Sequence, residues 1–270
     1  MKRIIHLSDL HIGYRHQNLT QRFDSISQHI IEGYPNAFDY IIVITGDTVD
    51  DATIPYIYDA VCFYIKRLES AGFQVLMVPG NHDYGTGSYG DKKFVRIYKD
   101  VFFDNPDLQY PKLDIIDDIA FIGLDSMAEE LHWYDRLFAQ GELGEEQLLR
   151  LHDLLQSVPV RTCLKRVVYM HHHPFDPWPL HELKDSSHLG EVLLANNNVD
   201  ALLYGHNHQG RKHHQWGIAR CYDGGSSTQK YNVPCVHRII DLSKKPEEDI
   251  ETDLLNETSS QATTPSQKES

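Results

Sequence analysis

Five short segments of the sequence combine side chains that bind divalent metal ions. They read SDLH, GD, GNHD, HHHP and GHNH, and they begin at Ser8, Gly46, Gly80, His171 and Gly205. Carboxylate, imidazole and amide-oxygen donors without thiolate suit Mn, Fe, Zn or Co better than copper or an iron–sulfur cluster. Because these donors are too many for one tetrahedral ion, they predict two divalent ions roughly 3.5–4 Å apart with one carboxylate bridging them.

Each segment closely follows a short apolar run that is typical of a strand buried on both faces. We expect strands at 3–7, 40–44, 74–78, 119–124, 166–170 and 199–203, and helices at 21–32, 54–71, 145–156 and 187–195. This alternation predicts an α/β fold with substantial sheet. Open α/β sheets place ligand sites beyond the carboxyl ends of their strands, where these segments stand.

The last part of the chain has a different pattern. From Lys212 onward, polar turns separate short runs that we expect to form antiparallel strands. After Leu242 the sequence has almost nothing to bury. We therefore predict one catalytic domain over residues 1–243 and a disordered acidic and polar tail over residues 244–270.

Composition limits the classes of partner. The 270 residues carry a formal net charge of −14, which repels polyphosphate and makes tight binding of nucleic acid an unfavoured reading. The amino-terminal residues lack the apolar run of a signal peptide, and no later run is long enough to cross a bilayer. Widely spaced cysteines indicate reduced thiols: Cys62, Cys163, Cys221 and Cys235. We expect a soluble cytoplasmic protein without a membrane segment, and its oligomeric state stays open.

Taken in order, the five segments resemble the motif series of the calcineurin-like metallophosphoesterases over roughly residues 3–208. The resemblance implies a four-layer α/β/β/α sandwich of two mixed β-sheets flanked by helices. It also implies a dinuclear metal centre. One ion would be held by Asp9, His11 and His208, the other by Asn81, His171 and His206, with Asp47 bridging both.

The two histidines of GHNH can serve different ions of one centre, because residues two apart in an extended segment point to the same side. Three consecutive histidines compete for one ligand position. The family pattern favours His171, which directly follows the strand, and leaves His172 or His173 to face substrate or solvent.

The resemblance implies hydrolysis of a small phosphate ester by in-line attack of a water activated between the ions. It makes His82, Asn81 and Asp47 the catalytic candidates, with His82 protonating the leaving group or stabilising the transition state. A purely supporting role is the alternative for His82. Asp50 and Asp83 are expected to support ligands or cap helices.

Residues 121–126 and 141–155 resemble the branch that hydrolyses cyclic nucleotides and glycerophosphodiesters, although His173 replaces a proline of that branch. The candidate substrates are therefore phosphodiesters, cyclic AMP among them. Tyr84 or Tyr89 could stack on a base. Another loop could line the pocket with His132, Trp133 and Tyr134, whereas His181 and His188 are expected to face solvent or cap helices.

Three other functions stay open. The segment Asp9 to Gly13 is similar to that of a DNA nuclease of the double-strand-break repair type, but the acidic surface and the lack of a basic helical arm oppose that reading. A phosphomonoesterase would use the same ligands. A metal-binding scaffold without catalysis is disfavoured because it would need neither Asn81 nor His82.

Overall fold

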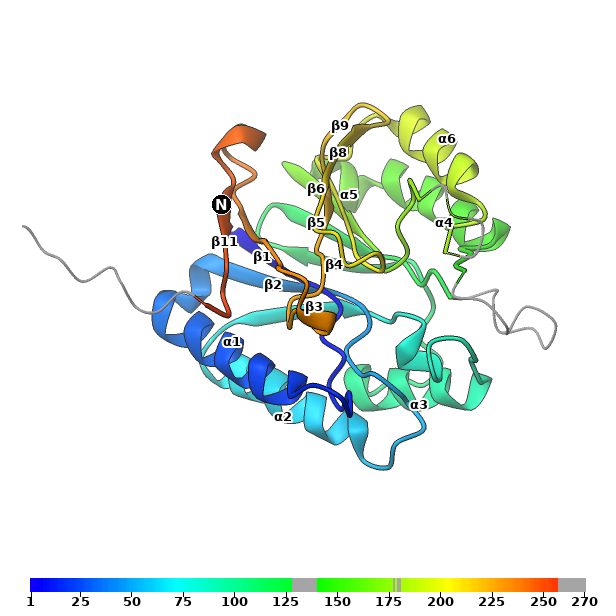
Figure 1. Ribbon diagram of the computed structural model, residues 1–270. Coiled ribbons are helices and arrows are strands. Elements are labelled where there is room, and N and C mark those ends of the chain that lie inside the picture. Colours follow the sequence, from blue (N-terminus) through cyan, green and yellow to red (C-terminus); the bar gives the residue numbers. More distant parts are fainter. Residues whose placement is uncertain (128–139, 177, 179–180, 257–270) are drawn as a thin grey trace, which may run out of the picture.

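The computed structural model describes residues 1–127, 140–176, 178 and 181–256, and these residues form two β-sheets with helices outside (Figure 1). The first sheet has the order β11-β10-β1-β2-β3 and the second the order β4-β5-β6-β7-β9-β8. The first sheet contains β1 (Arg3–Leu7), β2 (Tyr40–Thr45), β3 (Gln74–Val78), β10 (His237–Ile240) and β11 (Ile250–Thr252). The second contains β4 (Lys112–Ile116), β5 (Ile119–Gly123), β6 (Lys165–Tyr169), β7 (Ala201–Tyr204), β8 (Lys212–Gln215) and β9 (Ile218–Asp223).

Both sheets are mixed. Strands β1, β2 and β3 are parallel, and β10 joins β1 in antiparallel register with Ile5 opposite Ile239. In the second sheet β5, β6, β7 and β9 are parallel, while β4 and β8 add antiparallel edges. The parallel strands of each sheet therefore deliver their carboxyl ends to one edge.

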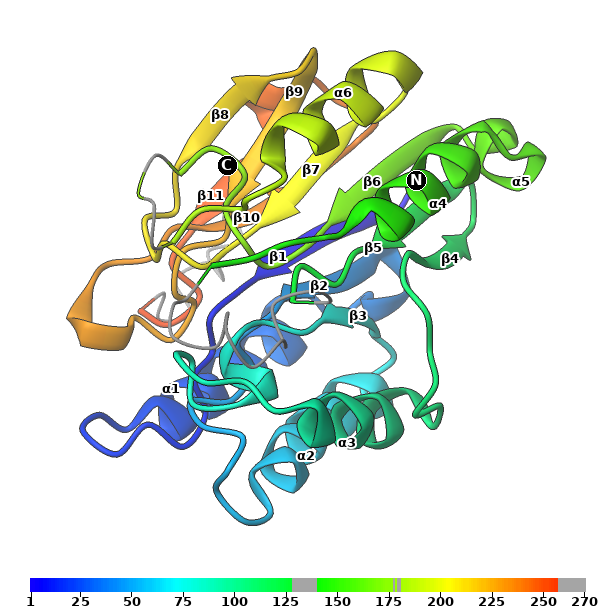
Figure 2. The same cartoon turned by 90° about the vertical axis from the view of Figure 1, so that its right-hand side faces the viewer.

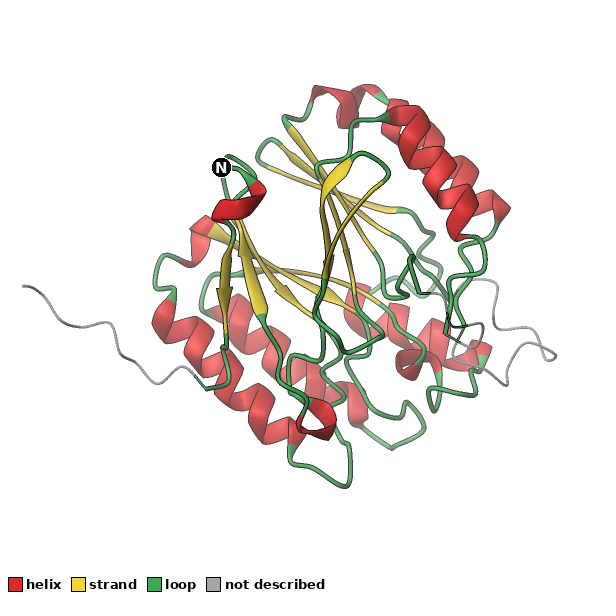
Figure 3. Ribbon diagram, turned by 45° about the horizontal axis from the view of Figure 1, so that its top comes forward, coloured by secondary structure: helices red, strands yellow, loops and turns green. Residues whose placement is uncertain are grey.

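Helices cover the outer face of each sheet, as Figure 3 shows. The helices over the first sheet are α1 (Leu19–Gly33), α2 (Ile57–Ser70) and α3 (Lys92–Phe103). Those over the second are α4 (Glu145–Gln156), α5 (Val158–Thr162) and α6 (Ser186–Asn196). Short 3-10 turns complete the connections: η1 (Ala37–Asp39), η2 (His82–Tyr84), η3 (Lys230–Asn232) and η4 (Pro246–Glu248).

Three apolar layers hold this sandwich together. The middle layer lies between the sheets, where Val43 and Val78 meet Phe121 and Leu203. One outer layer joins the first sheet to α1, α2 and α3, and the other joins the second sheet to α4 and α6. Apolar burial on both faces explains why central strands such as β2, β5 and β7 lack an alternating pattern. The predicted four-layer α/β/β/α sandwich is confirmed.

The carboxyl-terminal segment corrects one expectation. The prediction of disorder from residue 244 is wrong for residues 246–252, because η4 forms a 3-10 turn there and β11 pairs with β10 at the edge of the first sheet. Asp249 is buried and its carboxylate accepts from Nε of Arg220 at 2.8 Å and from the hydroxyl of Tyr222 at 2.7 Å. These partners lie in β9, so a polar stretch gains its order from a distant strand. Residues 257–270 lie outside the described part of the chain.

Within the described residues, none of the helices has the length and apolar character needed to cross a membrane. The cysteines are free, as the sequence predicts: Cys62, Cys163, Cys221 and Cys235.

Candidate metal centre

The strand ends of the two sheets meet at one end of the sandwich (Figure 2). His171 follows β6 in the second sheet, and its Nδ1 lies 2.8 Å from the carbonyl oxygen of Thr45, the last residue of β2 in the first sheet. In addition, the amide of His206 donates to Oδ2 of Asp9 across the same boundary at 3.1 Å. The two sheets therefore contribute side chains to a single site.

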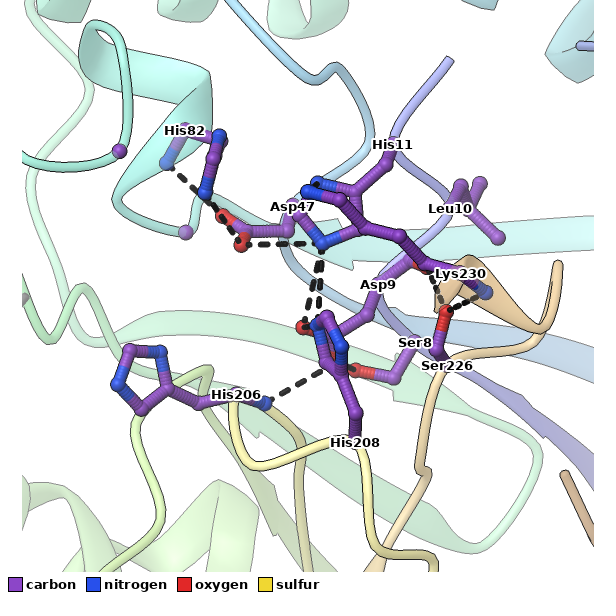
Figure 4. Close-up of polar contacts among 12 residues, drawn as sticks. Ser8, Asp9, Leu10, His11, Asp47, His82, His206, His208, Ser226 and Lys230 are labelled. Atoms are coloured by element: carbon purple, nitrogen blue, oxygen red, sulfur yellow. Dashed lines mark hydrogen bonds and ion pairs between the residues drawn. The ribbon is translucent and has the colours of Figure 1, made fainter. Parts of the chain in front are cut away.

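Asp9, His11 and His208 form the first donor set, and Figure 4 shows their side chains pointing toward one another. Nε2 of His208 lies 3.1 Å from Oδ1 of Asp9 and 3.1 Å from Nε2 of His11. Asp9 and His11 are buried and come from the loop after β1, while His208 comes from the loop after β7.

Asn81, His171 and His206 form the second donor set. Nε2 of His171 lies 2.9 Å from Oδ1 of Asn81 and 3.2 Å from Nδ1 of His206. The amide nitrogen of Asn81 donates to the carbonyl of Gly87 at 2.8 Å, which turns the amide oxygen toward His171. Because Nδ1–H of His171 donates to Thr45, its Nε2 carries the lone pair that a metal would accept.

Asp47 lies between the two donor sets. Its Oδ2 is 3.7 Å from Nε2 of His11, and its Oδ1 is 3.5 Å from Nε2 of His171. The carboxylate thus presents a different oxygen to each set. Gly80 approaches so closely that a Cβ at this position would collide with the carboxylate of Asp47, which explains the glycine of GNHD.

The backbone is strained at five of the seven predicted ligands. Their φ angles are positive: Asp9 at 52°, His11 at 45°, Asp47 at 50°, His206 at 77° and His208 at 54°. A non-glycine residue in this region costs about 1–3 kcal/mol, and such residues cluster at functional sites. The strain re-aims side chains from the strand direction toward a common centre.

Burial and charge set the protonation of the site. Desolvation, followed by the charges of neighbouring histidines, lowers the pKa of His11 and of His206 well below the usual range. For Asp9, burial alone would raise the pKa, but the charge of His208 holds it below the ordinary value. Burial alone would lower the pKa of His171, but the charges of Asp47 and Asp9 raise it above the ordinary value, so a divalent cation would have to displace a proton there.

The residues present fit two divalent ions. Oδ1 of Asp9 is buried and accepts no hydrogen bond from the described residues, although it faces His208. In both donor sets, imidazole nitrogens face each other at 3.1–3.2 Å. Imidazole nitrogens that converge with carboxylate and amide oxygens are the donor chemistry of a divalent cation site.

His82 lies at the rim of this centre. Its backbone amide donates to Oδ1 of Asp47 at 2.9 Å, and its Nδ1 lies 2.5 Å from the carbonyl oxygen of Asp50. That contact leaves Nε2 facing Asp47, whose Oδ2 is 3.9 Å away. The imidazole therefore presents one nitrogen to the pocket while the other is fixed.

Of the remaining histidines of HHHP, His172 lies beside the second donor set, with a ring nitrogen within 4.8 Å of those of His171 and His206. His172 is buried, with Nδ1 at 2.8 Å from the hydroxyl of Ser126, and burial lowers its pKa well below the usual range. Its ring lies 4.5 Å from that of His206, so it packs behind a predicted ligand. His173 packs against Tyr204. Of the two alternatives for these histidines, exposure to solvent is wrong because both are buried, and neither belongs to the pocket lining that the described residues form.

Asp83 and Asp50 contact the loops and side chains that carry the predicted ligands. The carboxylate of Asp83 accepts from the amides of Thr48, Val49 and Gly80 and joins the loops after β2 and β3. Burial raises the pKa of Asp83 to about 6. Asp50 lies 3.3 Å from Nδ1 of His11 through its Oδ1. Such partners orient metal-binding histidines.

A pocket of about 390 Å³ opens above the two donor sets, and Asp47, Asn81 and His82 form part of its lining. Tyr84 does not reach it, because its ring is buried and its hydroxyl donates to Asp125 at 2.9 Å. The expected stacking by Tyr84 is therefore wrong. Tyr89 stays outside the lining that the described residues form. The aromatic side chains in that lining are Trp178 and Tyr231.

His181 is exposed and also lines the pocket, whereas His188 is exposed near the start of α6. The loop of His132, Trp133 and Tyr134 lies outside the described residues.

Sequence reasoning missed Lys230. This lysine is buried, and its Nζ lies 2.7 Å from Oδ1 of Asp50 and 3.0 Å from Nδ1 of His11. A signal was available, because Lys230 stands in the polar loop after β9, a strand parallel to β7. Applying the strand-end rule to this strand would have pointed to the loop.

A sequence profile described as "Calcineurin-like phosphoesterase" matches residues 2–210, which include all seven predicted ligands. The chain belongs to this family. The predicted family membership is confirmed, and it supports a metal-dependent hydrolase of phosphate esters.

Two curated relatives match over part of their length. The chain is 28% identical over 185 residues to the 3',5'-cyclic adenosine monophosphate phosphodiesterase CpdA of Haemophilus influenzae. This alignment covers 64% of this chain and 56% of CpdA. It is 34% identical over 111 residues to the DNA double-strand break repair protein Mre11 of Sulfurisphaera tokodaii. This second alignment covers 39% of this chain and 27% of Mre11. The chain thus spans little more than half of one relative and about a quarter of the other.

Solved structures support the fold. A dimetal phosphatase from Danio rerio superposes with a TM-score of 0.65 at 14% identity, covering 88% of this chain and 92% of that protein. A protein from Thermus thermophilus gives a TM-score of 0.58 at 12% identity, covering 94% of this chain and 99% of that protein.

Proposed function

We propose that the chain is a dinuclear metal-dependent phosphodiesterase that hydrolyses small phosphodiesters, cyclic nucleotides such as cyclic AMP among them. The position of Asp47 carries the proposal, because its two oxygens face two separate donor sets at 3.7 and 3.5 Å. Two divalent ions bound there would supply positive charge to the phosphoryl oxygens and lower the pKa of a water between them.

Each ion has its own protein ligands in this proposal. One ion takes Asp9, His11 and His208, the other takes Asn81, His171 and His206, and Asp47 is shared. These donors accept Mn, Fe, Zn or Co, so cellular supply rather than the ligand set decides the pair.

His82 is the proposed proton donor. Its Nδ1 donates to the carbonyl of Asp50, so the neutral ring would carry a lone pair on Nε2. His82 would therefore act as proton donor in its imidazolium form, with the second proton on Nε2 facing the ester oxygen that leaves the phosphorus. Its 21% exposed side chain stands at the rim, where a leaving group would pass into solvent. General acid catalysis by a positioned histidine contributes roughly 100- to 10,000-fold.

Similarity to CpdA supports a diester rather than a monoester as the substrate, since that relative is named for hydrolysis of cyclic AMP. A nuclease is the second candidate, because the match to Mre11 covers 39% of the chain. The net charge of −14 opposes that function, because an acidic surface repels a long phosphate backbone.

One set of assays tests these functions. Protein reconstituted with Mn²⁺ is given bis(p-nitrophenyl) phosphate, p-nitrophenyl phosphate, cyclic AMP, and single- and double-stranded DNA. We expect turnover of the diester and of cyclic AMP without cleavage of DNA. Preference for the monoester would make the protein a phosphatase, degradation of DNA would make it a nuclease, and inactivity toward every compound would favour a scaffold.

A further inference from the structure

The wall of the pocket carries two exposed aromatic side chains. Tyr231 is 61% exposed and Trp178 is 69% exposed, and both line the same pocket as Asp47 and His82. Large aromatic rings left in water beside a polar site are typical of surfaces that contact a ligand.

The backbone around Tyr231 has a defined conformation that hydrogen bonds hold in place. Gln229, Tyr231 and Asn232 have φ angles of 56°, 59° and 58°, a left-handed conformation that ordinary side chains rarely adopt. The amide of Tyr231 donates to Oε1 of Gln17 at 2.6 Å. Arg22 of α1 donates to the carbonyl of Gln229 at 2.8 Å and to Oδ1 of Asn232 at 2.8 Å. Helix α1 therefore fixes this strained turn from outside the pocket.

The ring of Tyr231 lies next to the first donor set. Its centroid is 6.4 Å from that of His208 with an interplanar angle of 33°, so the two rings are only moderately tilted. Tyr14 packs against it nearly at a right angle, at 5.7 Å, and Nζ of Lys230 lies 5.4 Å from its centroid. These contacts hold the ring in place beside His208, a predicted metal ligand.

We infer that Tyr231 stacks on a planar aromatic group carried by the substrate, so that the substrates are nucleoside or aryl phosphodiesters rather than purely aliphatic ones. The inference rests on the proposed function for the position of the phosphate. Asn207 and Gln209 line the same pocket and offer amide donors and acceptors to the edge of a base. Stacking on a fixed ring tolerates different bases, because every base has a flat face.

The test compares two ligands that share a sugar phosphate and differ in the base. Binding of 5'-AMP and of ribose 5-phosphate to the Mn²⁺-loaded full chain is measured by calorimetry. We expect the wild type to bind AMP about ten-fold tighter than ribose 5-phosphate. Tyr231→Leu, which keeps apolar bulk without a ring, should bring that ratio close to one, and Tyr231→Phe should retain it.

Tyr56→Leu is the matched control, because Tyr56 is also an exposed tyrosine with a positive φ, at 61°, but does not line the pocket in the part of the chain that is described. It should leave the ratio unchanged. Equal or absent binding of the two ligands by the wild type, or an unchanged ratio in Tyr231→Leu, overturns the inference. A base preference that depends on Tyr231 in a protein that hydrolyses no phosphodiester would keep the aromatic subsite and reject the proposed function.

Discussion

The ammonium group of Lys230 lies 2.7 Å from Oδ1 of Asp50, and the lysine is almost entirely buried. Asp50 also contacts two imidazoles: its Oδ1 is 3.3 Å from Nδ1 of His11, and its carbonyl oxygen is 2.5 Å from Nδ1 of His82. The Lys230–Asp50 pair therefore links the proposed metal ligand to the proposed proton donor. It joins the loop after β9 to the loop after β2.

Lys230→Met should weaken metal binding and activity together, because Asp50 loses the positive charge that fixes its carboxylate beside His11. Loss of a partner that orients a metal-binding histidine typically costs about 10- to 100-fold. The measurement is a Mn²⁺ titration by calorimetry combined with turnover of bis(p-nitrophenyl) phosphate.

Lys165→Met serves as the control for this experiment, since Lys165 also forms a 2.8 Å ion pair, with Asp200, away from the pocket. It should leave both quantities within about two-fold, the range of a partly exposed pair. If Lys230→Met binds Mn²⁺ as tightly as the control does, the pair has no role in holding His11.

Asp47→Ala should remove both ions at once, because its two oxygens face different donor sets. Metal content is measured by elemental analysis after gel filtration. By comparison, Asn81→Ala should weaken only the set to which Asn81 belongs and leave one ion per chain. A full complement of two ions in Asp47→Ala would exclude the bridging position.

His82→Ala should lower turnover and leave the metal content near normal. The imidazole stands at the rim, and its predicted task is proton donation, so the loss should be about 100-fold or more. The loss should shrink for a diester whose leaving group needs no proton, such as bis(p-nitrophenyl) phosphate, compared with cyclic AMP. Equal losses on both substrates would assign His82 a supporting role instead.

Asp249→Ala should destabilise the fold, because Arg220 would stay buried without its carboxylate partner. Breaking a buried pair from one side costs roughly 3–5 kcal/mol. The free energy of unfolding is measured in urea. Glu247→Ala, an exposed position of the same turn, should change it by less than about 0.5 kcal/mol. Equal stability of the two variants would mean that the β11 segment adds nothing to the fold.

The sequence predicts strands such as β2 well, because all its residues are buried and read as an unbroken apolar run. The sequence does not predict strand β4, because only Ile116 of KLDII is buried and its charged residues interrupt the apolar run. Helix α3 was missed too, although Phe94 and Tyr98 bury one of its faces. Edge strands and surface helices give weaker signals because solvent tolerates many residues there.

The same contrast holds at the site. The segments that carry the predicted ligands stand out because parallel strands bring their carboxyl ends together, while the assignment of each ligand rests on the family resemblance. The same rule points to the loop that carries Lys230, but the position of the Tyr231 ring depends on a left-handed turn that Arg22 holds from another element. Local sequence does not encode that contact, so the place of Tyr231 in the pocket lining could not be predicted from the sequence.

The free energy of unfolding should depend on pH through the titration of His237. This residue of β10 is buried, and its Nδ1 lies 3.2 Å from the amide of Leu254. Burial lowers its pKa from 6.5 to about 4. The unfolded chain therefore binds a proton that the native state refuses between these two values, and stability that is complete above pH 6.5 is lost as the pH falls toward 4.

His237→Gln removes this titration while its amide oxygen can still accept from Leu254. Between pH 7 and pH 5 the wild type should lose about 2 kcal/mol more unfolding free energy than the variant. Urea unfolding with a chelator in every sample separates this effect from metal release. His214→Gln, at an exposed position of β8, should follow the wild type. Parallel pH profiles for wild type and His237→Gln would mean that the His237 pKa is the same in the folded and the unfolded chain, which contradicts the prediction.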